Sequence, residues 1–534
     1  AAWELSRPEN GGRFDVTVYQ RGWRLGGKGA SGVAIDAADR RIEEHGIHIL
    51  MGFYRSTFEI LRDCYSTIAA HPEIWPAPTL SWDDVFVPRE HIWVGEPRPD
   101  GSWETWDFDV TQLGPFAGAA NVVRRFLDRF NAGHGQLLAD IHQDLGKLHS
   151  ATDFLKSATK PKAGGDVSVD ELSQTFDLVW KSASPVLSSS ARLRKLTATL
   201  YAATAGAMGL VKDGLASPPH DFSRIDDWDF REWLRSRGPS VPDSAAHVTW
   251  DSPIVRAVYD LVFSLDRSVA AGAACCNLLN ILFGWQDHVY YKMATGMGDA
   301  VFAPLYLVLA QHRNVKFRFF HRATRIDLDA AGDAVAAITF ERQIRDADAY
   351  VPLRAHDALG YPVWPNQPWT EPGSPLAGDT DAQVFESENP SPVADAPLTI
   401  RQGADFDAVV LGVSVGALRG QLGDGLRGNP AFRRMVEDTR TMPTQAAQLW
   451  FTAGDAGDPA ALQWHEGRAM AGFAEPMSSC TEMNQVLDKE TFPDPRPHTL
   501  AYLCGAFPDA PDRHAEALAA VERNTRTWLD EHAQ

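Results

Sequence analysis

A glycine-rich stretch that carries two cations is the first part of the sequence with obvious chemical potential. Residues 20–32 read Gln-Arg-Gly-Trp-Arg-Leu-Gly-Gly-Lys-Gly-Ala-Ser-Gly, with five glycines in the last eleven positions. Glycine lets backbone amides approach an anion closely, and Arg24 and Lys28 add positive charge. The stretch therefore predicts an anion-binding loop, and the alternative is a flexible surface turn.

A second stretch gathers acidic and histidine side chains. Residues 43–48 read Glu-Glu-His-Gly-Ile-His. Two histidines three positions apart beside two carboxylates could bind a metal ion. Gly46 lies between the histidines, and no helical pattern surrounds them that would bring both to one face, so we expect no metal site here. Residues 56–59 form a capping-box pattern followed by apolar residues at helical spacing, so residues 43–48 connect into a helix.

The elements around the glycine-rich stretch form a familiar order. Residues 1–6 are typical of a helix end, residues 7–12 of a tight break, and residues 14–19 of a strand. Helix, turn and strand make the second half of a βαβ unit. Gln20 stands at the strand end, where an acidic residue usually binds a ribose hydroxyl in a dinucleotide fold. Such a fold also needs a first strand and a glycine turn, which we expect upstream of Ala1.

The middle of the chain predicts strands and then helices. Residues 84–94 and 103–110 predict a hairpin, and residues 113–235 are mostly helical by pattern. Four tryptophans lie near the hairpin; they predict sheet packing, or alternatively the wall of an apolar cavity: Trp82, Trp93, Trp103 and Trp106. The uncharged run 268–286 contains polar residues, so we expect a buried or interfacial helix rather than a membrane span.

The second half of the chain supplies further nucleotide-domain features. Residues 295–299, Thr-Gly-Met-Gly-Asp, predict a loop with Asp299 as the cap of the helix that follows. Strands are expected at 315–319, 322–329 and 335–340. Residues 343–404 predict a long proline-rich loop or insertion, and a last helix is expected from Arg513. The continuous apolar run 407–415 predicts a buried parallel strand.

The stretches 23–28 and 44–54, taken together, resemble the FAD-binding amine-oxidase superfamily. Within it the sequence is most similar to carotenoid desaturases of the ζ-carotene and phytoene type. The resemblance implies an α/β fold: a Rossmann-like FAD-binding domain of the two-dinucleotide-binding-domain flavoprotein type, with an inserted α+β substrate domain. The implied FAD-binding parts are residues 1–75, 285–342 and 405–420, and the implied substrate parts are 76–284 and 421–534. The family's N-terminal Gly-x-Gly-x-x-Gly turn and C-terminal Gly-Asp segment have no counterpart in these 534 residues.

The resemblance also assigns roles to individual residues. His48 is the candidate catalytic residue, tuning the flavin; the alternative is a structural histidine that bonds the backbone. The implied cofactor-binding residues are Gln20, Arg24, Gly26, Gly27, Lys28, Gly46, Ile47, His48, Ala323 and Thr324. Among these, the residues from Arg24 to Lys28 would lie along the FAD phosphates, residues 46–48 along the flavin, and Ala323 and Thr324 near the adenine.

The expected function is an FAD-dependent oxidoreductase that removes hydride from a C–H bond of a small hydrophobic molecule, as a desaturase does. One alternative is a flavin amine oxidase acting on an amine or amino acid, and another is a non-catalytic partner protein that keeps the flavin fold. The net charge of −20 excludes a large nucleic-acid surface. Five cysteines predict a reducing compartment, hence the cytoplasm. A polyene substrate would add peripheral contact with a membrane.

Overall fold

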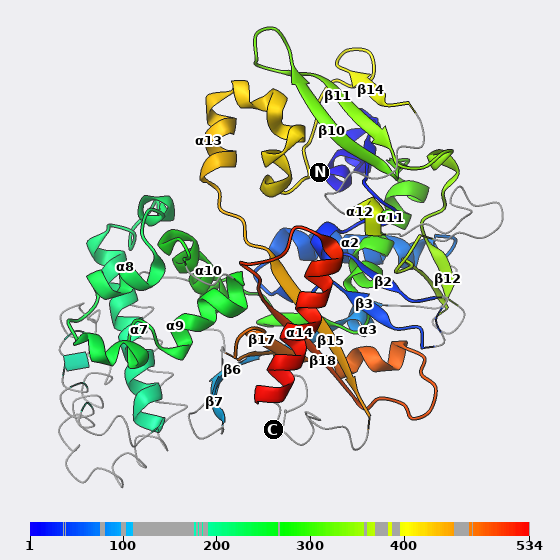
Figure 1. The fold of residues 1–534 in the computed structure, drawn as a ribbon. Helices are drawn as coiled ribbons and strands as arrows, with labels where there is room; N and C mark the ends of the chain where they lie inside the picture. Colours follow the sequence, from blue (N-terminus) through cyan, green and yellow to red (C-terminus); the bar gives the residue numbers. More distant parts are fainter. Residues whose placement is uncertain are drawn as a thin grey trace.

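The chain is a mixed α/β protein with several small sheets, as a computed structural model describes it (Figure 1). The described residues are 1–74 without 36 and 38, 81–97, 103–109, single positions between 173 and 184, 191–264, 268–356, 360–368, 383–386, 396–452, and 469–532 without 473. Residues 113–172, the first part of the stretch predicted to be mostly helical, lie outside them. Within the described ranges, no helix has the length and apolar character needed to cross a bilayer.

The N-terminal helix, turn and strand are confirmed. Helix α1 (Ala2–Leu5) is followed by a 3-10 turn, η1 (Pro8–Asn10), and then by β1 (Thr17–Tyr19). Strand β1 pairs in parallel with β9 (Lys316–Arg318), which comes from nearly 300 positions further along the chain. A continuous helical segment leads into β9; it comprises η7 (Gly298–Phe302), α11 (Ala303–Leu307) and η8 (Val308–His312). The predicted order of loop, helix and strand is therefore present.

Short antiparallel strands follow the glycine-rich stretch. β2 (Ser31–Val33) pairs with β3 (Ile42–Glu44), and β8 (Tyr290–Met293) lies between β4 (Ile49–Met51) and β5 (Phe86–Arg89). Helix α2 (Arg55–Ala70) is confirmed, and its apolar side is buried. The predicted capping box is wrong, because the helix begins at Arg55 after Tyr54 and no side chain caps it. Ser56 is therefore already inside the first turn, too late to accept from the end amides.

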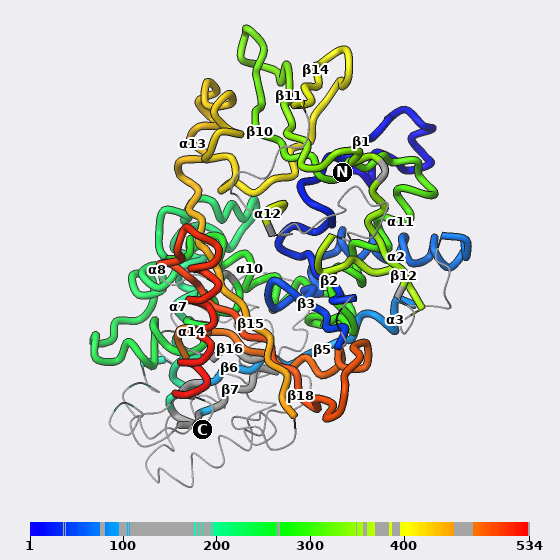
Figure 2. Tube along the Cα trace, turned by 45° about the vertical axis from the view of Figure 1, so that its right-hand side comes forward, coloured from blue at the N-terminus to red at the C-terminus, as the bar shows by residue number. Residues whose placement is uncertain are grey.

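Six strands from two distant parts of the chain form the largest sheet, in the order β15-β18-β17-β16-β6-β7. The predicted hairpin is confirmed as β6 (His91–Pro97) and β7 (Trp103–Asp109). The other strands are β15 (Thr444–Phe451), β16 (Ala469–Gly472), β17 (Ser479–Glu482) and β18 (Thr499–Ala506), and β16 joins β6 in parallel. The last helix, α14 (His514–His532), lies beside β15 (Figures 1 and 2).

A helical region occupies residues 191–283, drawn in green in Figure 1. It contains α7 (Ala191–Lys212), η4 (Phe222–Ile225), α8 (Phe230–Arg237), η5 (Asp243–Val248), α9 (Pro253–Ala257), η6 (Val258–Phe263) and α10 (Ala271–Phe283). These elements share one apolar core, which includes Tyr201, Trp233 and Tyr259.

Two of the tryptophans near the hairpin have packing roles, as predicted. Trp82 in α3 (Trp82–Val85) lies against Phe86, and Trp106 is 2% exposed.

Strands β10 (His321–Leu328) and β11 (Val335–Arg342) confirm the predicted strand pair and form a sheet with β14 (Leu398–Arg401). The segment predicted as a long loop is more ordered than expected where it is described. It contains η9 (Ala347–Ala349), β12 (Arg354–His356), β13 (Tyr361–Val363) and α12 (Gln383–Glu386). Trp364 and Phe385 from this segment are buried in a core with Trp23 and Phe320. Its buried aromatic residues anchor it in this core.

The buried strand predicted at residues 407–415 is wrong. These residues form no strand, and Val410, Leu411 and Val413 are 69%, 39% and 40% exposed. An apolar run becomes a buried parallel strand only where neighbouring strands pair with it. Here no described strand pairs with it, and the chain continues into η10 (Val415–Arg419), η11 (Gln421–Gly428) and α13 (Pro430–Asp438). The remaining element is η12 (Asn484–Lys489).

Candidate functional site

The glycine-rich stretch forms a loop in which several amides lack a hydrogen-bond partner among the described residues. It enters from β1 and makes one 3-10 turn, η2 (Gly27–Gly29), before β2. Gly26 and Gly27 have φ of +119° and +57°, which other residues rarely adopt. Among the described residues, the amides of positions 25–28 have no hydrogen-bond acceptor. Consecutive amides without acceptors are groups that can bind an anion, and Lys28 is exposed in the same stretch.

The Arg24 side chain is buried, and its guanidinium binds a carboxylate of the protein itself. Its guanidinium donates from Nε and Nη2 to the two carboxylate oxygens of Glu386, at 2.9 Å and 2.8 Å. The residue is only 6% exposed, and the guanidinium lies 4.9 Å from the Trp23 ring centroid. The indole of Trp23 in turn donates to the Pro365 carbonyl. Arg24 therefore connects the loop to Glu386 in α12, and Trp23 connects it to Pro365.

His45 is held in its neutral form by this arrangement. Its Nε2 lies 3.1 Å from Nη2 of Arg24, and a guanidinium can only donate, so Nε2 accepts. Burial lowers the pKa of His45 below its ordinary value, and the charge of Arg24 lowers it further. His45 is therefore unsuited to bind or release a proton near neutral pH.

His48 is in the opposite electrostatic situation. Its Nδ1 lies 3.3 Å from Oε2 of Glu44, and its Nε2 lies 3.0 Å from the carbonyl oxygen of Lys28. Burial disfavours the imidazolium, but the Glu44 carboxylate and the Lys28 carbonyl more than offset burial, so the pKa of His48 is raised. Both neighbours of the ring are acceptors, which favours the doubly protonated form.

Glu44 connects His48 to a third segment. Its other oxygen, Oε1, accepts from the amide of Met297 at 2.6 Å, and its side chain is 2% exposed. The amide of Gly298 donates to Oγ of Ser31 at 2.7 Å. A Cβ on Gly296 or Gly298 would lie 2.4 or 2.6 Å from the same oxygen, so these glycines permit the close approach. Residues 296–298 therefore lie directly against β2 and β3.

Asp299 does not cap the helix as expected. The helical segment begins at Gly298, and Asp299 lies inside it, wholly buried. Its Oδ1 accepts from the Trp364 amide at 3.2 Å, while Oδ2 has no hydrogen-bond partner among the described residues. Burial raises the pKa of Asp299 to about 8, and the charge of Glu44 contributes in the same direction. At neutral pH this side chain is a neutral carboxylic acid.

Gln20, expected at the ribose, lies at the end of β1 that leads into the glycine-rich loop, and Ala323 and Thr324, expected near the adenine, lie in β10. The Gln20 carbonyl accepts from the His321 amide at 2.9 Å, which places Gln20 at the start of β10. Ala323 pairs with Phe340 across the sheet, and the Tyr19 ring stacks on Phe340 at 4.4 Å. Thr324 lies at the irregularity of β10, and its hydroxyl donates to the Thr339 carbonyl.

Gly46 and Ile47 lie against the large sheet. The Ile47 amide donates to Sγ of Cys504 in β18 at 3.1 Å, and a Cβ on Gly46 would lie 3.4 Å from the same sulfur. Sequence reasoning missed Cys504, as it missed Ser31, Glu386 and the bridging role of Glu44. Glu44 could have been suspected from its i, i+4 spacing to His48. Cys504 and Glu386 come from distant segments, and Ser31, although it lies in the glycine-rich stretch, bonds to Gly298, 267 positions away. No local pattern marks these three contacts.

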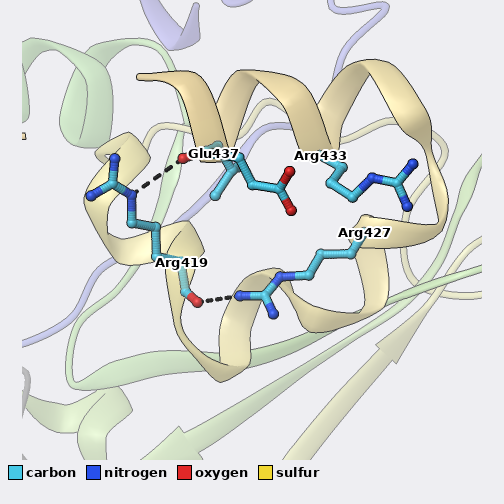
Figure 3. A pocket seen from close by; sticks show the side chains of 5 residues that line it. Arg419, Arg427, Arg433 and Glu437 are labelled. Atoms are coloured by element: carbon cyan, nitrogen blue, oxygen red, sulfur yellow. Dashed lines mark hydrogen bonds between the residues drawn. The ribbon is translucent and has the colours of Figure 1, made fainter. Parts of the chain in front are cut away.

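A cavity of about 260 Å³ lies elsewhere, between η10, η11 and α13. Arg419, Arg427, Arg433, Val436 and Glu437 line it. The Glu437 carboxylate points between Arg427 and Arg433, as Figure 3 shows. Two of the guanidiniums are already engaged, since Arg419 donates to the Val436 carbonyl and Arg427 to that of Arg419. This cavity shares no residue with the loop at 20–32.

No model of a known protein family matches the chain, and no curated protein matches it.

Proposed function

We propose that this chain is an FAD-dependent oxidoreductase that removes hydride from a C–H bond of a hydrophobic substrate, in the manner of a desaturase. Its nucleotide-binding part would be a Rossmann-like domain. The observation that carries the proposal is that residues 44–48 and 296–298 both contact the glycine-rich loop, in which the amides of residues 25–28 have no acceptor in the part of the chain that the structure describes. The resemblance described above supplies the cofactor and the class of substrate.

The residues of this site fit FAD in part. The free amides of residues 25–28, the left-handed glycines and the exposed Lys28 are donors suited to a pyrophosphate. The Gln20 carbonyl bonds to the first residue of β10, the strand that contains Ala323 and Thr324. Arg24 does not fit the expected role, because Glu386 occupies two of its donors. We therefore assign Arg24 to positioning the loop.

The protein's own groups would bind, orient and hold protons. The loop amides would bind the anionic part of the cofactor, and residues 46–48, fixed by Cys504 and Glu44, would line one side of the ring. His48 would hold a proton at Nδ1 and at Nε2, a positive charge favourable to a nearby anion. Bound FAD would supply the hydride acceptor. The buried aromatic residues that pack with Trp364 and Trp23 would keep water away from the base of the loop.

An absorption spectrum of the purified chain, before and after incubation with FAD, tests the proposal. We expect a two-banded flavin spectrum that is released on denaturation. A Gly27→Asp variant places a carboxylate in the loop where a side chain has free space. We expect it to lose the flavin while its circular dichroism is kept. A wild-type protein that stays colourless at saturating FAD would refute the cofactor. Once the flavin is established, polyenes and amines offered as substrates distinguish a desaturase from an amine oxidase.

A further inference from the structure

We propose that Glu44 and His48 form a protonation-dependent tie between the glycine-rich loop and residues 296–298, so that the site binds its anionic ligand more weakly when His48 loses its proton. The inference rests on the proposed function only in taking FAD as that ligand. Glu44 is a positioning residue in this arrangement, because it acts through His48 and through the amide of Met297.

The tie is a continuous series of contacts across the site. The Lys28 carbonyl lies 3.0 Å from Nε2 of His48, whose Nδ1 lies 3.3 Å from Oε2 of Glu44. Oε1 of Glu44 accepts from the Met297 amide at 2.6 Å. The side chains of His48 and Glu44 are 13% and 2% exposed. The contact of Nδ1 with Glu44 is an ion pair without hydrogen-bond geometry, whereas Nε2 hydrogen-bonds to the Lys28 carbonyl.

The number of protons on His48 decides whether the series is complete. An imidazolium donates from both ring nitrogens, and both of its neighbours here are acceptors. A neutral imidazole has one N–H and no charge. The ion pair with Glu44 is then lost, and the Lys28 carbonyl keeps its donor only if the remaining proton is on Nε2. Carbonyl and N–H point in opposite directions across a trans peptide, so a held Lys28 carbonyl also restricts the orientation of the adjoining loop amides.

Other charged groups around His48 do not take over this role. Burial and then the charge of Arg24 lower the pKa of His45, on the same segment, and Arg24 itself is paired with Glu386. Lys28 points its charge into solvent while its carbonyl faces the ring. Asp299 has a raised pKa, and so does the Cys504 thiol that faces Ile47 from β18. Both are uncharged near neutral pH, so Glu44 is the anion that faces His48.

The direction of the pH effect follows from the sign of the shift. Glu44 and Lys28 raise the pKa of His48 above its ordinary value near 6.5, against the effect of burial. The tie is therefore complete below about pH 6.5 and is lost as the pH rises through the raised value. Loosening of the loop and loss of the positive charge both weaken anion binding on the alkaline side.

The experiment is a titration of the full chain with FAD between pH 6 and pH 9 at constant ionic strength, followed by flavin fluorescence. We expect the wild-type Kd to rise by about tenfold across this range, the size of an ordinary coupling between two sites. Glu44→Gln keeps an acceptor for Met297 but removes the charge, so the midpoint should move to lower pH. His48→Gln should remove the pH dependence on the acid side of the ionisation of Asp299, whose pKa is about 8. A wild-type Kd that does not change with pH, or a Glu44→Gln midpoint that does not move, overturns the tie.

His71→Gln is the matched control, because His71 also pairs through Nδ1 with a carboxylate, Glu73, at 3.0 Å, but at the end of α2. It should reproduce the wild-type profile; a flattened profile would assign the pH effect to a general loss of surface charge and overturn the tie. Near-ultraviolet circular dichroism shows whether His48→Gln folds. If it does not, the comparison of the wild-type and Glu44→Gln titration midpoints tests the proposal without it.

Hydrogen exchange without FAD separates this inference from the proposed function. After correction for intrinsic exchange rates, the peptides covering residues 22–32 and 295–302 should lose protection together as the pH rises, and Glu44→Gln should lose it at lower pH. If FAD does not bind at any pH but this loss occurs, the tie stands and the proposed cofactor fails. Protection of both peptides that is independent of pH overturns the tie, whatever FAD does.

Discussion

Arg24 and Glu386 lie 362 positions apart in the chain, and the two carboxylate oxygens of Glu386 accept from two nitrogens of the Arg24 guanidinium. The pair fastens the base of the glycine-rich loop to α12. Because the Arg24 side chain is 7% exposed and that of Glu386 26% exposed, the bonds are shielded from water on one side. The residue that the sequence marks as a phosphate contact therefore has a structural partner.

This pair gives the first prediction. Arg24→Ala and Glu386→Gln should each lower the free energy of unfolding by about 1–3 kcal/mol, since each leaves a partly buried charged partner behind. Both should also weaken FAD binding to a similar extent, because both release the loop. Urea unfolding and FAD titration of the two variants measure this. A much larger loss of FAD in Arg24→Ala than in Glu386→Gln would instead place the guanidinium on the cofactor.

The second prediction compares two neighbouring glycines. Both have positive φ, but a Cβ on Gly26 would lie 2.8 Å from the Phe302 ring, whereas a Cβ on Gly27 would meet nothing within 4 Å. Gly27→Ala should cost about 1 kcal/mol, the strain of the left-handed backbone alone. Gly26→Ala should cost clearly more, because Phe302 or the loop must move as well. Thermal unfolding of the two variants gives the comparison, and equal losses would contradict the described loop.

The third prediction concerns Asp299. Burial raises its pKa to about 8, far above the value near 4 of an unfolded chain. The folded protein thus holds an extra proton between about pH 4 and pH 8, and this group makes stability fall as the pH rises through that window, by up to about 1.4 kcal/mol per pH unit. In Asp299→Asn that contribution should vanish. Urea unfolding at pH 5, 6.5 and 8 tests it, and parallel curves for wild type and variant would contradict it.

The fourth prediction tests the contact between β2 and residues 296–298. Ser31→Ala leaves the buried Gly298 amide without its acceptor, which should cost about 1–3 kcal/mol. Ser223→Ala is the control, because the Ser223 hydroxyl donates to Asp221 on the exposed surface and its loss should cost less than about 1 kcal/mol. Chemical denaturation of both variants measures the difference. A Ser31→Ala protein as stable as Ser223→Ala would show that the amide finds another acceptor.

Local patterns predicted the elements near the site well. The helix, break and strand of residues 1–19, the hairpin at 91–109 and the strand pair at 321–342 all follow from alternation and turn residues within one window. The same reasoning failed at Ser56 and Asp299, where helices begin earlier than the capping residues suggest. It also failed at residues 407–415, because burial of an apolar run depends on partner strands that the run itself does not specify.

By itself the sequence determined a mixed α/β chain with a glycine-rich, anion-suited loop followed by a Glu/His segment, since glycine conformations and short-range periodicity are local properties. Only the tertiary structure decided which charged side chains are paired with another group. It pairs Arg24 with Glu386, keeps His45 neutral beside Arg24, and places Glu44 between His48 and Met297. The charge state and hydrogen bonds of a side chain depend on neighbours brought from hundreds of residues away, and no local pattern contains them.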